Sequence, residues 1–266
     1  MKSPFDLFLF STDTVTIRRA VAGGVAGAVV DWERVGKAER QSGFDTQIND
    51  DTVDDLRRVR DAVSVTLICR MNRLGPESSA EIESAIDAGA DEVLLPMVRD
   101  PSEVEAVLER AAGRCQVGFL VETTEAVARI AEFAGLPVSR VYLGLVDLSI
   151  ERRSPNVFSS LVDGTVDRVR EAVEAPFGFG GLTLPESGTP IPCRLLIAEM
   201  ARLDCGFSFL RRSFLADTRH RDASAEVPRI LDAVAAARRR ADTEVARDRE
   251  SLLDLVGSWS SKNAVS

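Results

Sequence analysis

Short apolar runs alternate along the chain with amphipathic segments, at intervals typical of a strand–helix repeat. Several runs, such as EVLLPMV and RVYLGLV, are almost continuously apolar, as strands buried on both faces must be. Eight runs predict strands: Leu7–Ser11, Gly27–Trp32, Val65–Met71, Glu92–Val98, Val117–Glu122, Val141–Val146, Gly178–Leu184 and Phe207–Arg212. Eight amphipathic segments predict helices: Val15–Ala22, Val53–Val63, Ser79–Ala88, Pro101–Ala112, Glu125–Phe133, Asp163–Val173, Pro192–Leu203 and Ala225–Arg239.

Eight strand–helix units in strict alternation favour an α/β protein with a (β/α)8 TIM barrel. A length of 266 residues suits one such domain. We predict a catalytic barrel domain over residues 1–240 and a C-terminal helical extension over residues 241–266. An open doubly wound sheet is the alternative. Neither GxGxxG nor GxxxxGK[ST] follows the first strand, which disfavours nucleotide-binding versions of that alternative.

Two segments fall outside the repeat. Arg34–Thr52 is long and polar and follows the second predicted strand, so it is either a lid or substrate contact, or a solvated loop. The charged tail contains an apolar patch at Leu252–Val256. A lone chain gains little by exposing such a patch, so we expect the C-terminal helix to pack on a neighbouring subunit of a homo-oligomer.

The composition argues against several classes of binding partner and cellular location. The formal net charge is −9 and no basic tract stands apart from acidic neighbours, which argues against nucleic acid. No apolar stretch approaches the length of a membrane span, and the apolar run near the N-terminus is too short for a signal peptide. The four cysteines form no CxxC pair and predict free thiols in a cytoplasmic protein.

Two carboxylates stand at the ends of neighbouring predicted strands. Glu122 ends the fifth run, QVGFLVE, and Asp147 ends the sixth, RVYLGLVD. Catalytic groups of a barrel gather where strands end, so both acids are expected at one point. Two oxygen ligands with room for water suit Mg²⁺ or Mn²⁺. Alternatively, a strand-end acid can cap the helix that follows.

The second and third predicted strands add charged groups to the same face. Arg70 ends the third, and a guanidinium there can bind a carboxylate through two hydrogen bonds. Asp31 and Glu33 end the second, and Thr123 directly follows Glu122. Together these residues predict a pocket for a 2-oxo acid, with a metal that stabilises an enolate. Arg70 and Glu33 could instead form a simple salt bridge.

Five motifs in chain order, VDWE, ICRMN, LLPMV, VET and GLVDLS, resemble those of the HpcH/HpaI-type aldolases and the citrate lyase beta-subunit relatives. This family belongs to the phosphoenolpyruvate/pyruvate-binding barrel superfamily. The similarity runs from about Asp31 to Ala175. It implies class II aldolase activity on 4-hydroxy-2-oxo acids, or cleavage of malyl-, citramalyl- or citryl-thioesters, in trimers or hexamers.

The resemblance also assigns roles to single residues. Glu122 and Asp147 match the ligands of the divalent metal. Arg70 matches the arginine that binds the carboxylate of pyruvate or oxaloacetate and stabilises the enolate. Glu33 matches an acid that reaches the water shell of the metal. Pro96, in LLPMV, is expected to shape the pocket, to which we also assign Asp31 and Thr123 as substrate contacts.

One position departs from the aldolase pattern. Arg34 stands where the family places a histidine for proton transfer, and the only histidine is His220, after the eighth predicted strand. The lyase branch has a D-x-E-D-type motif and a nearby lysine, and this chain has Asp31-Trp32-Glu33-Arg34 and Lys37. The general acid and base therefore stay open, with a metal-bound water or Glu33 as candidates.

Three functions remain at this point. The first is a metal-dependent carbon–carbon lyase or aldolase acting on a 2-oxo acid with an aldehyde or acyl partner. The second is a lyase or hydrolase of CoA thioesters, with Arg211, Arg212 and Arg219 forming a cationic groove. The third is a binding protein without catalysis on the same barrel.

Overall fold

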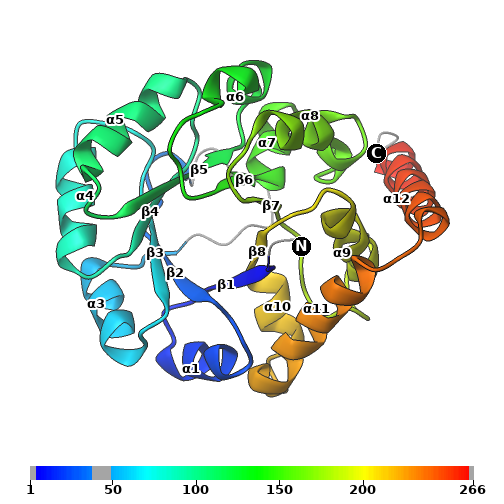
Figure 1. Cartoon of the computed structure of the whole chain (residues 1–266), viewed down its shortest axis with the longest axis horizontal. Helices are drawn as coiled ribbons and strands as arrows, with labels where there is room; N and C mark the ends of the chain where they lie inside the picture. The colour runs from blue at the N-terminus through cyan, green and yellow to red at the C-terminus, as the bar shows by residue number, and fades with distance from the viewer. Residues whose placement is uncertain (1–3, 38–48, 264–266) are drawn as a thin grey trace.

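The computed structural model describes residues 4–37 and 49–263, and Figure 1 shows helices arranged around a ring of strands. Eight parallel strands pair in the order β7-β6-β5-β4-β3-β2-β1-β8. The Gly206 N–H, just before β8, donates to the carbonyl of Phe177 in β7 at 2.9 Å, so the two ends of the sheet meet in a nearly closed barrel. The predicted barrel is confirmed and the open sheet was wrong. The strands are β1 Asp6–Phe10, β2 Gly27–Asp31, β3 Thr66–Arg70, β4 Glu92–Leu95, β5 Gln116–Val121, β6 Val141–Leu143, β7 Phe177–Phe179 and β8 Phe207–Leu210.

The outer helices begin at residues suited to that position. Asp13, Asp100 and Asp222 each accept a hydrogen bond from a backbone N–H of the first turn that follows. Thr52 forms a reciprocal capping box with Asp55. The helices are α1 Thr14–Ala22, α3 Val53–Ala62, α4 Ser78–Asp87, α5 Pro101–Ala111, α6 Thr124–Ala128, η1 Ile130–Phe133, α7 Leu145–Glu151, η2 Ser159–Leu161, α8 Thr165–Ala172, α9 Cys193–Arg202, α10 Arg212–Asp217, α11 Ala223–Ala237 and α12 Asp242–Asn263.

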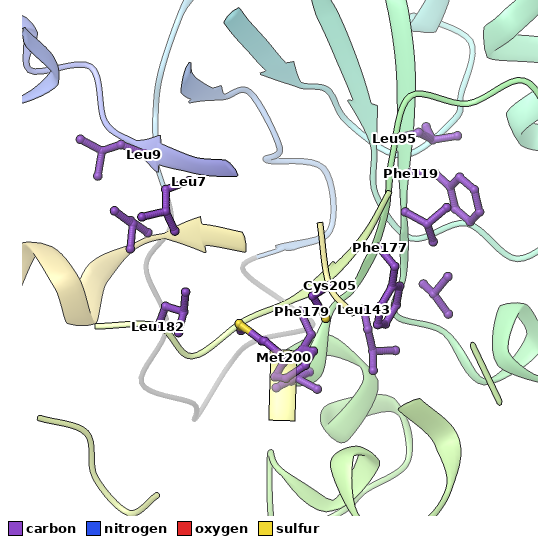
Figure 2. Packing of buried hydrophobic residues seen from close by; sticks show 14 of the residues in the cluster. Leu7, Leu9, Leu95, Phe119, Leu143, Phe177, Phe179, Leu182, Met200 and Cys205 are labelled. Atoms are coloured by element: carbon purple, nitrogen blue, oxygen red, sulfur yellow. The ribbon is translucent and has the colours of Figure 1, made fainter. Parts of the chain in front are cut away.

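Alternate residues of each strand pack on opposite sides of the barrel wall, because successive side chains of a strand point to opposite faces. A large outer cluster joins strands to helices; Figure 2 shows Phe119 and Phe179 within it. A second cluster takes the intervening positions and fills the interior. Its buried members are Phe8, Phe10, Val29, Ile68, Leu94, Leu120, Tyr142, Phe207 and Phe209.

A buried ion pair lies at the N-terminal end of the barrel interior. Glu92 and Arg140 each lie two residues before a member of the inner cluster. The Arg140 guanidinium lies over the Phe8 ring at 4.1 Å from its centroid. A Cβ at Gly118 would come within 2.7 Å of Oε1 of Glu92, so a glycine leaves room for the pair. Charge and aromatic rings therefore fill this end of the barrel.

The C-terminal helix α12 packs beside α9 of the same chain, outside the ring of helices (Figure 1). Leu252 and Val256 are each only 1% exposed, and Asn156 donates a side-chain hydrogen bond to the Val256 carbonyl. The chain itself thus covers part of the patch expected to contact a neighbouring subunit, and that explanation of the patch was wrong for these two residues. Leu253 and Leu255 stay exposed. The homo-oligomer remains a prediction.

Several boundaries differ from the sequence prediction. Strand β6 ends at Leu143, so Asp147 lies in the first turn of α7 instead of at a strand end. Strand β7 covers only Phe177–Phe179. Most of the candidate lid lies outside the described residues, which resume at residue 49. Within the described part of the chain, none of the helices has the length and apolar character needed to cross a membrane.

Candidate active site

Four charged residues of the site continue the inward-facing positions of the barrel. Each lies two residues beyond a member of the inner cluster, so strand alternation turns it to the same side. Asp31 follows Val29, Arg70 follows Ile68, Glu122 follows Leu120 and Arg211 follows Phe209. The site therefore forms the next layer above the apolar interior, at the C-terminal ends of the strands.

Arg70 is held by acidic residues from β2 and the turn after it. Its Nε and Nη2 lie 2.8 and 2.6 Å from the two carboxylate oxygens of Asp31, and its Nη1 lies 3.2 Å from Oε2 of Glu33. Burial acts to lower the pKa of Arg70, but Asp31 and Glu33 outweigh it and raise that pKa. Arg70 is 2% exposed and permanently charged. Its orientation is therefore fixed before any substrate binds.

Asp31 is the centre of this network. Besides Arg70 it accepts hydrogen bonds from Nζ of Lys37 at 3.1 Å and from the Asn49 amide at 3.2 Å. Burial raises the pKa of Asp31, but Arg70 and Lys37 more than offset this and hold it well below its usual range. Lys37 also lies 3.3 Å from Glu33. Asp31 is fully buried with these partners and does not line the cavity, so it holds Arg70 in position, and its contact with substrate remains a prediction.

Glu122 is buried at the end of β5, and its environment disfavours the negative charge. Burial first, then Asp147 and Glu33, raise its pKa to about 8. Its Oε1 accepts a hydrogen bond from the N–H of Met97 at 2.9 Å, and Met97 has φ of 56°, in the left-handed region. A Cβ at Gly144 would lie 2.3 Å from its Oε2, so only glycine fits there. Backbone on both sides thus fixes this carboxylate.

Asp147 brings a second carboxylate close to the first. It is 6% exposed in the first turn of α7, and its charge is the second largest cause of the raised pKa of Glu122. Two mutually repelling acids in a buried site are a functional signal. Within the described ranges, no group of three or more His, Cys, Asp or Glu residues could hold a metal ion. A cation here would need further oxygen donors from water and substrate.

A cavity of about 290 Å³ opens at these residues. Arg70, Glu122 and Asp147 line it together with Tyr142 and Arg211. Its other lining residues are Leu120, Gly144, Leu145, Val146, Val157, Phe158, Gly180, Gly181, Leu182, Thr189, Pro190, Phe209, Arg212 and Ser213. Three of the predicted site residues therefore meet at one cavity, drawn from β3, β5 and α7.

Other predicted residues lie elsewhere. Thr123 is fully buried; its hydroxyl donates to the Val98 carbonyl and accepts from the Ala126 N–H. It caps α6 and does not line the cavity, and the substrate contact assigned to it remains a prediction. Pro96 is buried beside Met97 and does not line the cavity, although it occupies the inward position of β4.

Glu33 and His220 also lie off the cavity wall. Glu33 is 1% exposed and contacts Arg70 and Lys37. His220 is exposed in the turn after α10, so it does not replace the histidine that the sequence lacks at Arg34. Proton transfer by Glu33 remains a prediction.

Sequence reasoning missed Tyr142 as a site residue and placed Arg211 only in a cationic groove. Both line the cavity. Strand alternation was the available signal: Tyr142 and Gly144 are two apart in VYLGLVD, and Arg211 directly follows β8. Of the three arginines proposed for that groove, Arg211 and Arg212 reach the cavity and Arg219 does not.

Fold and cavity define a TIM-barrel protein whose candidate site lies at the C-terminal ends of the strands. No protein-family model and no curated protein matches the chain. Among solved structures, the citrate synthase SbnG is similar over 82% of this chain and 90% of its own, with a TM-score of 0.56 and 19% identity. Tryptophan synthase from M. tuberculosis in an open form is similar over 88% and 94%, with a TM-score of 0.58 and 14% identity. At these identities the likeness establishes the barrel shared with enzymes, and the activity must be argued from the site.

Proposed function

We propose that this protein is a divalent-metal-dependent carbon–carbon lyase or aldolase that acts through the enolate of pyruvate or a related 2-oxo acid. The observation that carries the proposal is the meeting of Glu122, Asp147 and Arg70 at one cavity. The resemblance of the strand-end motifs to HpcH/HpaI-type aldolases supports the same chemistry. One of the similar barrels is also a citrate synthase by name.

The two carboxylates fit a hard divalent cation. The raised pKa of Glu122 shows that this position disfavours a bare negative charge, and a cation would remove that penalty. Both groups supply oxygen, as Mg²⁺ and Mn²⁺ prefer, and the cavity leaves room for further oxygen donors. The bound ion would act as a Lewis acid toward the carboxylate and keto oxygens of the 2-oxo acid.

The reaction we propose is a retro-aldol cleavage. The proton leaves the 4-hydroxyl group, the C3–C4 bond breaks, and its electron pair moves to the C2 carbonyl to form the enolate. C4 becomes the carbonyl carbon of the departing aldehyde. Protonation of the enolate at C3 then gives the 2-oxo acid, and the same steps in reverse form the bond.

Arg70 is the residue we assign to binding the carboxylate and stabilising the enolate oxygen. Two of its five N–H groups bind Asp31 and a third points at Glu33, which leaves two for a ligand in the cavity. Because the acids hold the guanidinium in place, the donors need little reorganisation as negative charge develops.

Glu33 is the acid we assign to proton transfer. It does not line the cavity, so a proton from the substrate would reach it through an intervening water molecule. It lies 3.3 Å from Lys37 and 3.2 Å from Arg70, and its carboxylate oxygens can accept that proton.

The direct test is exchange of the pyruvate methyl protons for deuterium, followed by NMR with and without Mg²⁺ or Mn²⁺. We expect metal-dependent exchange that Glu122→Gln, Asp147→Asn and Arg70→Ala each reduce at least about a hundredfold, as loss of a main electrostatic group does. Glu125→Gln is the matched control, because Glu125 is an exposed acid three residues from Glu122 and outside the cavity. Exchange at the wild-type rate in either acid variant would refute the assigned ligands.

A second candidate is a lyase or hydrolase of CoA thioesters. The observation in its favour is that Arg211 and Arg212 both line the cavity, where they could meet the CoA phosphates. A rise in melting temperature with CoA or acetyl-CoA would support it. No rise, together with metal-dependent pyruvate exchange, would favour the aldolase.

A further inference from the structure

Residues 156–161, called here the wall segment, form part of the cavity wall. The segment follows α7, and its residues Val157 and Phe158 line the cavity. Phe158 is 9% exposed, and a Cβ at Gly181, another lining residue, would lie 3.6 Å from Cε1 of its ring. Both side chains of the segment are apolar and carry no group for the proposed chemistry. Their position therefore affects which ligands fit, and it does not affect which bonds react.

Asn156 links the wall segment to the C-terminal helix α12. It is fully buried at the start of the segment. Its side-chain amide donates to the Val256 carbonyl of α12 at 3.0 Å, and its Oδ1 accepts from the Phe158 N–H at 2.9 Å. One side chain thus bridges α12 and the backbone of a residue that lines the cavity.

Arg249 binds the other end of the wall segment. Its Nη1 donates to the carbonyl of Leu161, the last residue of η2, at 2.6 Å. The same nitrogen lies 2.6 Å from Oε1 of Glu199 in α9, whose side chain is 2% exposed. The buried carboxylate holds the guanidinium in place through a charged hydrogen bond. Helix α12 therefore contacts the wall segment at both of its ends.

The contacts come from one face of α12. Arg249, Leu252 and Val256 lie at positions i, i+3 and i+7, a spacing that places side chains on the same side of a helix. Leu252 and Val256 are each 1% exposed, and they belong to the same hydrophobic cluster as Phe158 and Leu161. This face thus combines apolar packing with two polar contacts to the wall segment.

The wall segment has little secondary structure of its own. Its only element is η2, a 3-10 helix of three residues between α7 and α8. Such a short turn gains little stability from its own hydrogen bonds, so packing against neighbouring elements must keep it ordered. Segments of this kind open locally when such contacts are lost. The contacts with α12 are therefore suited to keep the cavity wall in place.

We propose that α12 supports the apolar wall of the candidate active site through two positioning residues, Asn156 and Arg249. By fixing the wall segment, they set how closely Val157 and Phe158 approach the carbon chain of a bound 2-oxo acid. This inference rests on the proposed function, which places the carboxylate and keto group of that acid at Arg70 and the metal. The C-terminal helix then contributes to ligand binding from outside the barrel, without touching the ligand.

The test compares two 2-oxo acids that differ only in the length of their carbon chain, in isothermal titrations with the Mn²⁺-loaded protein. The probes are pyruvate and 2-oxohexanoate, which has three more methylene groups. Each methylene buried against an apolar wall raises affinity by up to about fourfold, so we expect the wild type to bind 2-oxohexanoate about tenfold or more tightly than pyruvate.

Three variants weaken the support without altering the cavity lining. Leu252→Ala, Asn156→Ala and Arg249→Met should each reduce the preference for 2-oxohexanoate about threefold or more, roughly the contribution of one buried methylene. Their affinity for pyruvate should stay unchanged, because its binding groups lie on other elements. A general loss of structure would weaken both acids alike. If Leu252→Ala does not fold, Arg249→Met decides, since Arg202 still pairs with Glu199 in that variant.

Leu253→Ala and Arg247→Met are the matched controls, because both residues are exposed on α12 close to the positions tested. Both should keep the wild-type preference. Hydrogen–deuterium exchange in peptides that cover residues 154–162 measures the support without any ligand. Exchange should be faster in the three variants than in the wild type and unchanged in the controls.

Three results would overturn the inference. The first is a wild type that shows no preference for 2-oxohexanoate, since the wall then does not contact the carbon chain. The second is an unchanged preference in Leu252→Ala and Arg249→Met, even with faster exchange in the wall segment. The third is an equal loss of preference in the Leu253→Ala and Arg247→Met controls.

The two proposals can fail separately. If pyruvate shows no metal-dependent proton exchange but the preference for 2-oxohexanoate is present and depends on Leu252 and Arg249, the proposed reaction fails and the support by α12 stands. If the exchange occurs and the preference does not depend on α12, the proposed function stands and the support is overturned.

Discussion

Arg140 binds Glu92 inside the barrel, with its Nε 2.7 and 2.9 Å from the two carboxylate oxygens and its Nη2 2.7 Å from one of them. Glu92 is fully buried and Arg140 is 9% exposed. The pair lies at the end of the strands opposite the candidate site. It therefore bears on stability and is separate from the proposed chemistry.

Breaking that pair should destabilise the fold. We expect Glu92→Gln to lower the free energy of unfolding by about 3 to 5 kcal/mol, because it leaves the buried Arg140 without its opposite charge. Urea denaturation measures the loss. The double variant Glu92→Leu, Arg140→Met removes both charges and should be less destabilised than the single variant. If the single and double variants lose equal free energy of unfolding, the unpaired charge of Arg140 is not the cause of the loss.

Asp31 should act through Arg70. We expect Asp31→Asn to lower metal-dependent pyruvate exchange at least about tenfold, because one bidentate partner of Arg70 is weakened and its orientation loosens. Pyruvate binding should weaken with it. Asp54→Asn, on the exposed face of α3, is the control and should behave as wild type. Normal exchange in Asp31→Asn would mean that Glu33 alone positions Arg70.

Gly144 should be required for the position of Glu122. An alanine Cβ there would lie 2.3 Å from the carboxylate oxygen, so Gly144→Ala should displace the carboxylate and weaken Mn²⁺ binding about tenfold or more. Gly257→Ala is the matched control, because a Cβ at that helical position meets nothing within 4 Å. Titration of Mn²⁺ by electron paramagnetic resonance measures both. Wild-type affinity in Gly144→Ala would separate Glu122 from the metal.

Metal affinity should depend on pH through Glu122. In the metal-free protein its pKa is raised to about 8, so below that pH a cation must displace a proton. Apparent affinity for Mn²⁺ should rise by up to about tenfold for each pH unit as pH approaches 8, and then level off. Because the pKa is raised on folding, stability of the metal-free protein should fall as pH rises from the ordinary value of 4.5 to about 8.

Glu122→Gln provides the control for both effects. The amide does not titrate, so the Mn²⁺ affinity that remains should change little over this pH range, and the metal-free stability should lose its dependence there. A wild-type affinity that is flat between about pH 6 and 8 would contradict the raised pKa.

The sequence was sufficient for the barrel because eight apolar runs in alternation with amphipathic helices have few other arrangements. It was also sufficient to bring Arg70 and Glu122 to one cavity, since both directly end or follow buried strands. It was less reliable for Asp147, because β6 ends at Leu143 and Gly144 already begins the helix that follows, whereas the sequence LVDLS is compatible with a strand or a helix.

Contacts far apart in the chain could not be read from local pattern. The bidentate pairing of Asp31 with Arg70 joins residues 39 apart, and only the register of β2 against β3 sets them side by side. The hydroxyl of Thr123 accepts a hydrogen bond from the Ala126 N–H and so caps the helix that follows. The sequence is compatible with this cap but does not require it. Tyr142 was passed over because an aromatic residue in a strand is usually core.

The layer of inward positions constrains how such a site can change during evolution. Since Asp31, Arg70, Glu122 and Arg211 sit two residues beyond the apolar interior, inserting or deleting one residue in their strands would turn such a group outward among the helices. New activities on this scaffold must therefore arise by exchange of single side chains in place. Gly144 is closed to such exchange by the Glu122 carboxylate, whereas Pro96, directly after β4, is an uncharged inward position where a new group could be introduced.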